Sequence, residues 1–261
     1  MLGGRPFSLI LGEVTQAPNY RALWRMFWRY PGPTKNLGRY FFGWGTYPWR
    51  CRVRTPCGEV APTLYSHHDM WTVNEVFCRE DYAAGPELRV FVDVGSNIGM
   101  SALYFLTRNY TSRGYLFEPV PKNIERLRAN LAGYERRYGI REAAVSERSG
   151  TATFGVEETG RYGGIGAQTG RSIEVESLAV NEVLGEILER ERAIDVLKVD
   201  TEGLELATVR AISPELLRKI RTIYLEVEEE PELHPELFER SFANTTCALR
   251  SRLHPAHGRA A

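Results

Sequence analysis

Hydrophobic and polar residues follow a repeating pattern in the second two thirds of the chain. Short apolar runs rich in β-branched residues alternate with longer amphipathic stretches, and glycine or proline punctuates the junctions. This alternation at this spacing predicts parallel strands joined by right-handed helical crossovers. We therefore expect an α/β fold with a doubly wound, mostly parallel sheet. The expected strands are 88–95, 113–119, 138–145, 193–200 and 221–228, and the expected helices include 99–109 and 121–133.

A second kind of pattern interrupts this order. The segments TATFGVEE and RSIEVES alternate apolar and polar residues, and they flank the glycine-rich stretch TGRYGGIGAQTG. Strict alternation is typical of strands with one buried face, and glycines suit turns with positive φ. We expect an antiparallel excursion whose loop is either a substrate lid or a plain surface loop.

The first 85 residues have a different texture. Leu23, Trp24, Phe27 and Tyr30 recur at helical spacing and predict an amphipathic helix that docks on a core through these side chains. The sequence PGP that follows is expected to end this helix, because proline breaks the helical hydrogen-bond pattern.

Charge divides the chain unevenly, although the formal net charge is zero. Residues 1–60 carry nine Lys or Arg and two acids, whereas residues 181–240 carry eight basic and sixteen acidic side chains. The basic segment also holds twelve of the 29 aromatic residues, a mixture that suits an anionic membrane or a nucleic acid as well as a core. We expect 1–85 to be an N-terminal basic, aromatic-rich extension that covers the cleft of a domain at 86–261 and offers a surface for a homo-oligomer.

Composition narrows the class of protein. With 261 residues, 43% hydrophobic and 25% charged, the chain is typical of a globular protein and unlike disordered, collagenous or disulfide-rich chains. It has no apolar run long enough for a transmembrane segment, and its start lacks the order of a secretory signal. Its four cysteines form neither a CxxC pair nor a zinc spacing, which favours reduced thiols. We expect a cytoplasmic protein.

The segment FVDVGSNIGMSALY carries the first candidate site. A buried strand ends at Asp93, turns through Gly95, Ser96 and Asn97, and enters a helix at Gly99. Such a turn lets the backbone approach a ligand, and the helix presents free N–H groups. The spacing is not GxGxxG, which disfavours an NAD-dependent oxidoreductase.

The next strand along the chain ends in a charged residue. Glu118 lies 23 residues after Gly95, where a carboxylate can accept both hydroxyl groups of a ribose, and Pro119 fixes the exit of the chain. The alternative is a structural carboxylate that caps a helix or forms a salt bridge.

A later strand ends in LKVDTEG. The carboxyl ends of parallel strands form the ligand-binding edge of such sheets, so Lys198, Asp200 and Glu202 are expected in the same cleft. Three ionisable groups so close together are expected to shift one another's pKa values. A network that only holds the strand end is the alternative.

Taken together, FVDVGSNIG, YLFEPVPKNIERLRANL, IDVLKVDTEGLELATVRA and IYLEVE resemble the FkbM family of methyltransferases, in order and over residues 65–228. The resemblance implies a Rossmann-like class I methyltransferase sheet with a final antiparallel strand. It also implies S-adenosylmethionine as methyl donor, S-adenosylhomocysteine as product, and an acceptor hydroxyl on a saccharide or a glycosylated or polyketide natural-product intermediate.

The resemblance also implies residue roles. The residues expected to hold the methionine part of the cofactor are Asp93, Gly95, Ser96, Asn97 and Gly99. Glu118 is expected to hold the ribose, and the residues expected to border the adenine are Pro119, Val120, Ala144 and Val145. By the same analogy Asp200 lies near the reacting methyl group.

A sugar hydroxyl has a pKa far above neutral, so a base beside it is useful. The candidates are Asp200, Glu202, Lys198 and one of the adjacent residues His67 and His68, which on a strand point to opposite faces. A divalent metal held by Asp200 and Glu202 is possible, but two acids are too few to predict a site.

The end of the chain departs from the family pattern. Only 33 residues follow Glu228, and the tail TTCALRSRLHPAHGRAA is a poor match to the usual closing strand pair, so we expect the sheet to end early or the tail to fray. The function expected from these observations is an O-methyltransferase that acts on a small-molecule or saccharide acceptor, with no nucleic acid. The alternative from another class is a non-catalytic module on a methyltransferase-like fold. In that case the N-terminal extension 1–85, here called the leader, binds nucleic acid or an anionic membrane.

Overall fold

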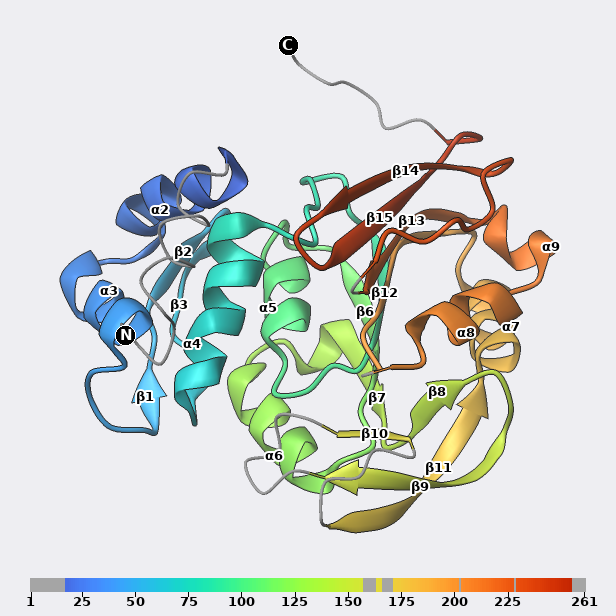
Figure 1. The fold of residues 1–261 in the computed structure, drawn as a ribbon, viewed down its shortest axis with the longest axis horizontal. Coiled ribbons are helices and arrows are strands. Elements are labelled where there is room, and N and C mark those ends of the chain that lie inside the picture. Colours follow the sequence, from blue (N-terminus) through green and yellow to red (C-terminus); the bar gives the residue numbers. More distant parts are fainter. Residues whose placement is uncertain (1–16, 157–162, 166–170, 202, 228, 255–261) are drawn as a thin grey trace.

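The computed structural model describes residues 17–156, 163–165, 171–201, 203–227 and 229–254 (Figure 1). Its centre is a seven-stranded sheet in the order β14-β15-β13-β12-β5-β6-β7. Five neighbouring strands are parallel, namely β13 (Ile220–Glu226), β12 (Ile194–Val199), β5 (Val90–Val94), β6 (Arg113–Phe117) and β7 (Tyr138–Arg141). The predicted α/β class with a mostly parallel sheet is confirmed.

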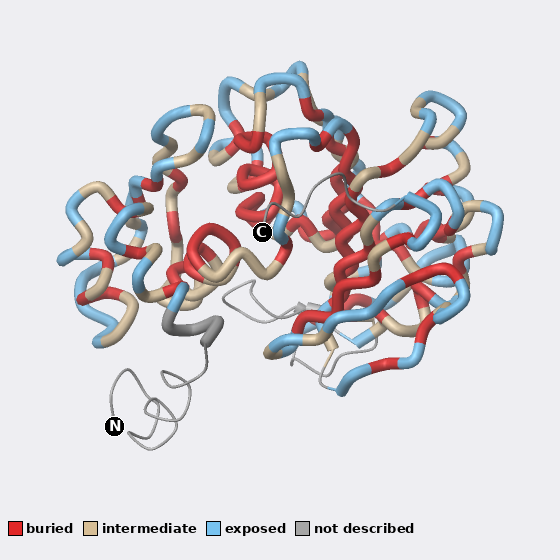
Figure 2. The backbone as a smooth tube through the Cα atoms, turned by 90° about the horizontal axis from the view of Figure 1, so that it is seen from above, coloured by how far each residue is buried: buried red, intermediate tan, exposed pale blue. Residues whose placement is uncertain are grey.

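Helices cover both faces of this sheet because its strands are apolar on both sides. Along β5, Phe91 packs into one core cluster with α5 (Met100–Leu106) and α6 (Pro121–Asn130). Its neighbours Val90 and Val92 pack into a second cluster with α7 (Val180–Arg190), α8 (Glu205–Ala211) and α9 (Pro214–Leu217). Figure 2 shows buried residues concentrated along the central strands. Burial on both sides is the expected pattern of a parallel sheet.

A smaller sheet holds the predicted antiparallel excursion. Its order is β10-β9-β11-β8, and β9 (Gly150–Val156) runs antiparallel to β10 (Gly163–Ile165) and β11 (Ser172–Ala179). The loop predicted as a lid or surface loop lies mostly outside the described residues.

The single strand predicted over 138–145 is wrong. The chain forms β7, crosses a short bend, and then forms β8 (Ala144–Ser146), which pairs in parallel with β11. A short 3₁₀ turn, η2 (Glu135–Arg137), precedes β7. The segment predicted as one strand therefore forms two strands in different sheets. It breaks between Arg141 and Ala144, where pairing with β6 ends and pairing with β11 begins.

The N-terminal part consists of small elements before the main sheet. Helices α2 (Ala17–Arg29) and α3 (Pro33–Phe42) are followed by two short hairpin-like pairs, β1 (Trp49–Arg50) with β4 (Thr63–Leu64) and β2 (Val53–Thr55) with β3 (Gly58–Val60). Helix α4 (His67–Val73) continues into a π-helical turn, η1 (Asn74–Arg79). This segment shares a core cluster with α5 and α6. None of the described helices has the length and apolar character needed to cross a membrane.

The predicted end of the first helix at PGP is confirmed, but its predicted core face is partly wrong. The buried side chains are Ala22, Met26 and Tyr30, whereas Trp24 and Phe27 are exposed. The buried face is turned relative to the predicted one, and Arg25 and Arg29 lie where they form ion pairs with Glu80, just after η1.

The expectation that the sheet ends early is wrong as well, whereas residues 255–261 of the tail lie outside the described residues. Strands β14 (Phe238–Ala243) and β15 (Thr246–Ser251) form a closing antiparallel pair, with β15 inserted beside β13. Cys247 and Leu249 of β15 are fully buried. The strand is not recognisable by alternation because it is covered on both faces.

Candidate active site

The turn after β5 forms as predicted, with positive φ at Gly95, Asn97 and Gly99. The N–H groups of Gly95 and Ser96 both donate to the carbonyl oxygen of Phe117 at 3.0 Å, which fixes the turn to the end of β6. The reason for glycine at 95 differs from the expected approach to a ligand. A Cβ there would lie 1.8 Å from the carbonyl oxygen of Asp200, so glycine allows two strand-end segments to touch.

Glu118 is bonded to this turn. Its Oε2 accepts the N–H of Asn97 at 2.8 Å, and its Oε1 accepts the N–H of Val120 and the amide of Asn123, each at 3.1 Å. The side chain is buried, and burial raises the pKa of Glu118 to about 6, against the opposing effect of these donors. The carboxylate is therefore held at the strand end, with its orientation fixed by the turn.

Lys198 lies at the centre of a buried charge network. Its Nζ is 3.1 Å from Asp93 Oδ1, 3.2 Å from Asp200 Oδ2 and 3.0 Å from the carbonyl oxygen of Gly95. Burial alone would lower the pKa of Lys198, but the Asp200 and Asp93 carboxylates raise it above its ordinary value. The two carboxylates therefore favour the protonated form of Lys198, which argues against a role for Lys198 as the base.

Asp93 also lies elsewhere than expected. It is fully buried, accepts the hydroxyl of Ser101 at 2.6 Å, and is not among the described residues that line the pocket. Its Oδ1 forms an ion pair with Lys198 Nζ at 3.1 Å. The predicted convergence of Lys198 and Asp200 on the Gly95 turn is seen, whereas Glu202 lies outside the described residues.

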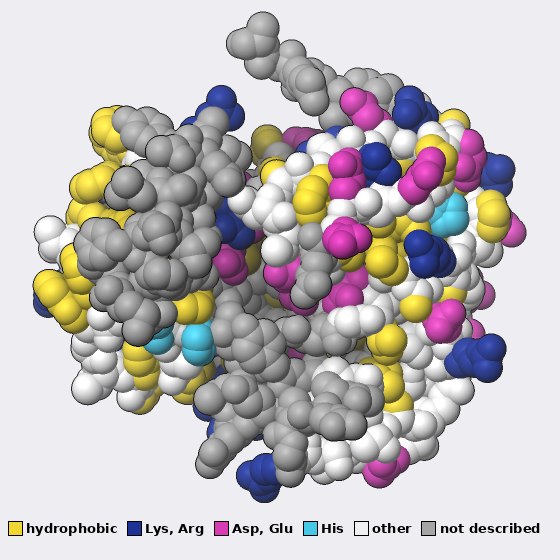
Figure 3. All heavy atoms as spheres, in the orientation of Figure 1, with side chains coloured by type: hydrophobic (Ala, Val, Ile, Leu, Met, Phe, Trp, Pro, Cys, Tyr) yellow, Lys and Arg dark blue, Asp and Glu magenta, His cyan; other side chains and the backbone are white. Residues whose placement is uncertain are grey.

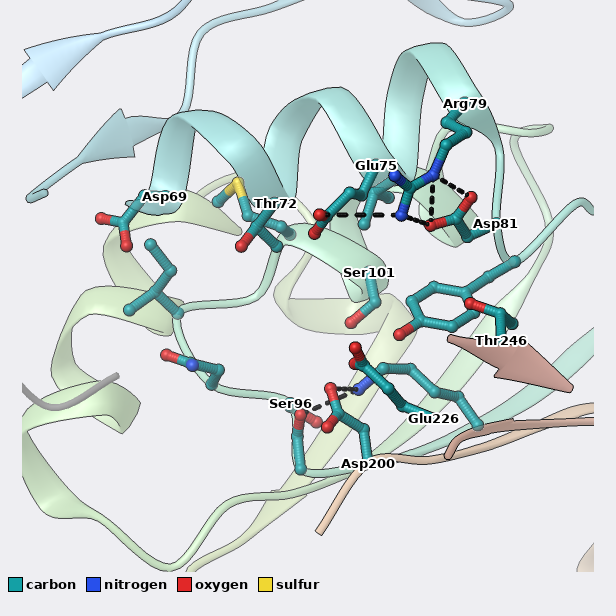
Figure 4. A pocket seen from close by; sticks show the side chains of 17 residues that line it. Asp69, Thr72, Glu75, Arg79, Asp81, Ser96, Ser101, Asp200, Glu226 and Thr246 are labelled. Atoms are coloured by element: carbon teal, nitrogen blue, oxygen red, sulfur yellow. Dashed lines mark hydrogen bonds and ion pairs between the residues drawn. The ribbon is translucent and has the colours of Figure 1, made fainter. Parts of the chain in front are cut away.

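A pocket opens over these strand ends (Figure 4). One wall comes from the main sheet and the Gly95 turn, and the other from the leader segment that precedes the sheet. Polar side chains dominate the lining, among them Asp69, Thr72, Glu75, Arg79, Ser96, Asn97, Asp200 and Glu226. Acidic residues outnumber basic ones in the whole lining, so the pocket suits a ligand with positive charge.

Glu226 is a pocket residue that the sequence analysis missed. It ends β13, next to β12 in the sheet, and its Oε1 accepts the hydroxyl of Thr245 at 3.0 Å. Glu226 is exposed at the pocket mouth, and partial desolvation there, followed by repulsion from Asp200 and Glu75, raises the pKa of Glu226 to about 7. Figure 4 shows Glu226 and Asp200 side by side. The strand-end rule that selected Asp200 applies equally to the E of IYLEVE, so the signal was present.

The leader contributes a row of polar side chains to the opposite wall. Arg79 Nε donates to Asp81 Oδ1 at 2.6 Å, and its Nη2 lies 3.6 Å from Glu75 Oε1 (Figure 4). These residues come from the π-helical turn η1 and the chain just after it. Such turns are often found at functional sites, because they re-aim side chains along a helix.

The two adjacent histidines are on a helix and not on a strand. Ser66 caps α4 by a reciprocal capping box with Asp69, and His67 begins the helix. Both imidazole rings pack edge-on against Trp71, with centroid distances of 4.9 and 4.8 Å. His68 is not among the described residues that line the pocket, while Asp69 is.

The residues expected at the adenine divide into two groups. Val120 and Ala144 share a small apolar cluster next to Glu118 and Pro119. Val145 points the other way, into the cluster under α7, so it cannot line the same surface. Adjacent residues of a strand face opposite sides, which accounts for the split.

Among the residues that the structure describes, no group of three or more His, Cys, Asp or Glu side chains is arranged to hold a metal ion.

Comparison with protein families matches residues 93–244 to the methyltransferase FkbM domain, which is more than half of the chain. The chain belongs to the FkbM methyltransferase family. The match begins at the strand end that carries Asp93 and continues into the closing pair β14–β15.

Several curated proteins resemble this FkbM-family chain. The 31-O-demethyl-FK506 methyltransferase FkbM of Streptomyces tacrolimicus is 26% identical over 68% of this chain and 81% of its own length. Methyltransferase sdnD of Sordaria araneosa is 27% identical over 60% of this chain and 73% of its own. The AMB antimetabolite synthetase AmbE of Pseudomonas aeruginosa is 28% identical over 64% of this chain, which spans only 10% of AmbE.

Among solved structures, the methyltransferase FkbM of Methylobacillus flagellatus KT aligns with a TM-score of 0.44 at 12% identity. The alignment covers 70% of this chain and 54% of that one.

Proposed function

We propose that this chain is an S-adenosylmethionine-dependent O-methyltransferase whose acceptor is a hydroxyl group of a saccharide or a polyketide-type metabolite. The observation that carries the proposal is the bond between the Asn97 N–H and Glu118, which joins the glycine turn to a strand-end carboxylate beside an acid-lined pocket. The family supports methyl transfer, and the relative named as a 31-O-demethyl-FK506 methyltransferase supports oxygen as the acceptor atom.

The charged and polar side chains that line the pocket fit this cofactor. S-adenosylmethionine carries a sulfonium and an ammonium group, and the pocket presents carboxylates from Asp200 and Glu226 beside the Ser96–Asn97 turn. Glu118 would hold the ribose hydroxyls, with Val120 and Ala144 as the apolar surface for the adenine. When bound, the cofactor supplies an electrophilic methyl group.

In this proposal the chain contributes a base for the acceptor hydroxyl and holds the cofactor and the acceptor in line. Asp200 is paired with Lys198, whereas Glu226 has a pKa raised to about 7, near the optimum for proton transfer. Glu226 would accept the proton of the acceptor hydroxyl. Asp200, fixed by Lys198, would keep the reaction centre oriented.

The opposite wall would position the acceptor. We propose that residues 1–85 form an extension over the cleft of a catalytic domain at 86–261. This is supported by the lining residues Asp69, Thr72 and Glu75, which come from α4 and η1. Hydroxyl-rich ligands are bound by such carboxylate and hydroxyl side chains.

The test is transfer of labelled methyl from S-adenosylmethionine to a panel of saccharides, macrolides and simple amines, with S-adenosylhomocysteine measured as product. We expect labelled methyl ethers from hydroxyl-bearing acceptors. Methylation of amines alone would overturn the oxygen assignment. Failure to bind the cofactor in any form would overturn the proposal as a whole.

A further inference from the structure

Large exposed hydrophobic side chains are concentrated in the leader. Seven are exposed among the described residues, and five of them lie between positions 24 and 44. We call these five the aromatic face: Trp24, Phe27, Trp28, Phe42 and Trp44. The three tryptophans are each more than 60% exposed. Figure 3 shows hydrophobic side chains along the margin over α2 and α3. Clusters of this kind on a soluble protein usually mark an interaction surface.

The exposure is not a result of a loosely attached helix. The other side of α2 is anchored, because Met26 and Tyr30 are fully buried in the core shared with η1. Arg25 Nη1 and Arg29 Nη2 lie 2.9 and 2.8 Å from the carboxylate of Glu80, and Arg25 also donates to the carbonyl oxygen of Cys78. The helix is therefore fixed with its tryptophans pointing outward.

Basic residues outnumber acidic ones in the segment that carries the aromatic face. Residues 17–60 contain eight Lys or Arg and a single acid, Glu59. Arg21, Lys35 and Arg50 are exposed, and Arg54 donates to the carbonyl oxygen of Trp28 at 3.1 Å, which places its guanidinium group beside the end of α2. The surface thus combines indole and phenyl rings with guanidinium groups.

We propose that the aromatic face docks on an anionic phospholipid surface. Indole rings favour the region between lipid headgroups and acyl chains, and arginines pair with the phosphate groups beside them. A second copy would place two basic faces against each other, which electrostatic repulsion disfavours. Because α2 packs on η1, docking would hold the pocket wall formed by Glu75 and Arg79 one helix away from the bilayer.

The inference does not depend on the methyltransferase reaction, and binding of the full chain to vesicles tests it. We expect cosedimentation with vesicles of phosphatidylcholine and phosphatidylglycerol, little with phosphatidylcholine alone, and release by salt. The double variant Trp24→Ser/Trp28→Ser is expected to bind at least about tenfold more weakly, because two rings that would insert into the lipid are lost. The matched control is Tyr110→Ser/Leu253→Ser, which removes the two large exposed hydrophobic side chains that the described part of the chain has outside the aromatic face.

A charge variant keeps the test valid if the double serine variant fails to fold. Arg21→Glu/Lys35→Glu alters only exposed side chains and is expected to reduce vesicle binding by a similar factor. Absence of binding to the anionic vesicles, or an equal loss in the Tyr110/Leu253 control, would overturn the proposal. So would a stable dimer in light scattering that the serine variant dissociates, or tighter binding to a polynucleotide than to the vesicles.

Discussion

The Nζ of Lys198 lies 3.0 Å from the carbonyl oxygen of Gly95, so the ammonium group of one strand is bonded to the turn that follows its neighbour. The same ammonium group bridges Asp93 and Asp200. A single buried cation thus holds together the turn, the strand that precedes it and the pocket carboxylate. The shape of the proposed cofactor site depends on this contact.

Replacement of Lys198 by Met is expected to destabilise the protein by about 3–5 kcal/mol, because it leaves the buried carboxylate of Asp93 without its cation. Urea unfolding at neutral pH measures the effect. The control is Lys219→Met. Lys219 Nζ lies 3.8 Å from Oε1 of Glu215, and both side chains are exposed, so the loss of this ion pair is expected to cost less than about 1 kcal/mol. Similar losses in both variants would show that the buried network does not stabilise the fold.

Gly95→Ala is expected to distort the turn, because the new Cβ would overlap the carbonyl oxygen of Asp200. Gly133→Ala is the matched control, since Gly133 also has positive φ but has open space around its Cα. The control is expected to lose about 1–2 kcal/mol from backbone strain alone. The difference between the two unfolding free energies isolates the contact with Asp200, and equal losses would show that this contact is not restrictive.

The buried Glu118 makes stability depend on pH. Its pKa rises from 4.5 to about 6 on folding, so the native state binds its proton more tightly than the unfolded state. Stability from this group is present below pH 4.5 and is lost as the pH rises through 6, by about 2 kcal/mol in total. The measurement compares urea unfolding of wild type and Glu118→Gln across this range. A difference between the two that does not change with pH would contradict the assignment.

Glu226→Gln is expected to lower kcat by about a hundredfold or more, since it removes the proposed base. In the wild type, kcat is expected to rise with pH through about 7, as Glu226 loses its proton. The variant should lose this limb of the pH profile. Glu229→Gln, which changes an exposed acid three residues further on, serves as control. A pH limb that survives in Glu226→Gln would assign the base to another residue.

The alternation of apolar runs and helices was sufficient to predict where along the chain the central strands β5, β6, β12 and β13 lie. Strand β5, helix α5 and strand β6 fall within the predicted ranges because Gly95, Gly99 and Pro119 mark the junctions. The run at 138–145 was misjudged because nothing local shows that Ala144 pairs with a second sheet. The closing strand β15 was missed because burial on both faces removes the alternation.

Only those residues of the candidate site that lie at the ends of the sheet strands could be predicted from the sequence. Asn97, Lys198 and Asp200 lie at strand ends, where chain topology brings them together. Asp69 and Arg79 enter the pocket through the packing of α4 and η1 on the core, which no local pattern in the leader records. Trp24 was assigned to the core because helical spacing identifies a stripe but does not say which stripe is buried.

The most direct test of the central claim is calorimetric titration with S-adenosylhomocysteine. We expect the wild type to bind with a dissociation constant on the order of micromolar. Glu118→Ala is expected to bind at least about tenfold more weakly, because the ribose would lose charge-assisted hydrogen bonds. Glu125→Ala, at an exposed position of α6, should bind as the wild type does. Equal affinity in wild type and Glu118→Ala, or no binding by the wild type, would contradict the account.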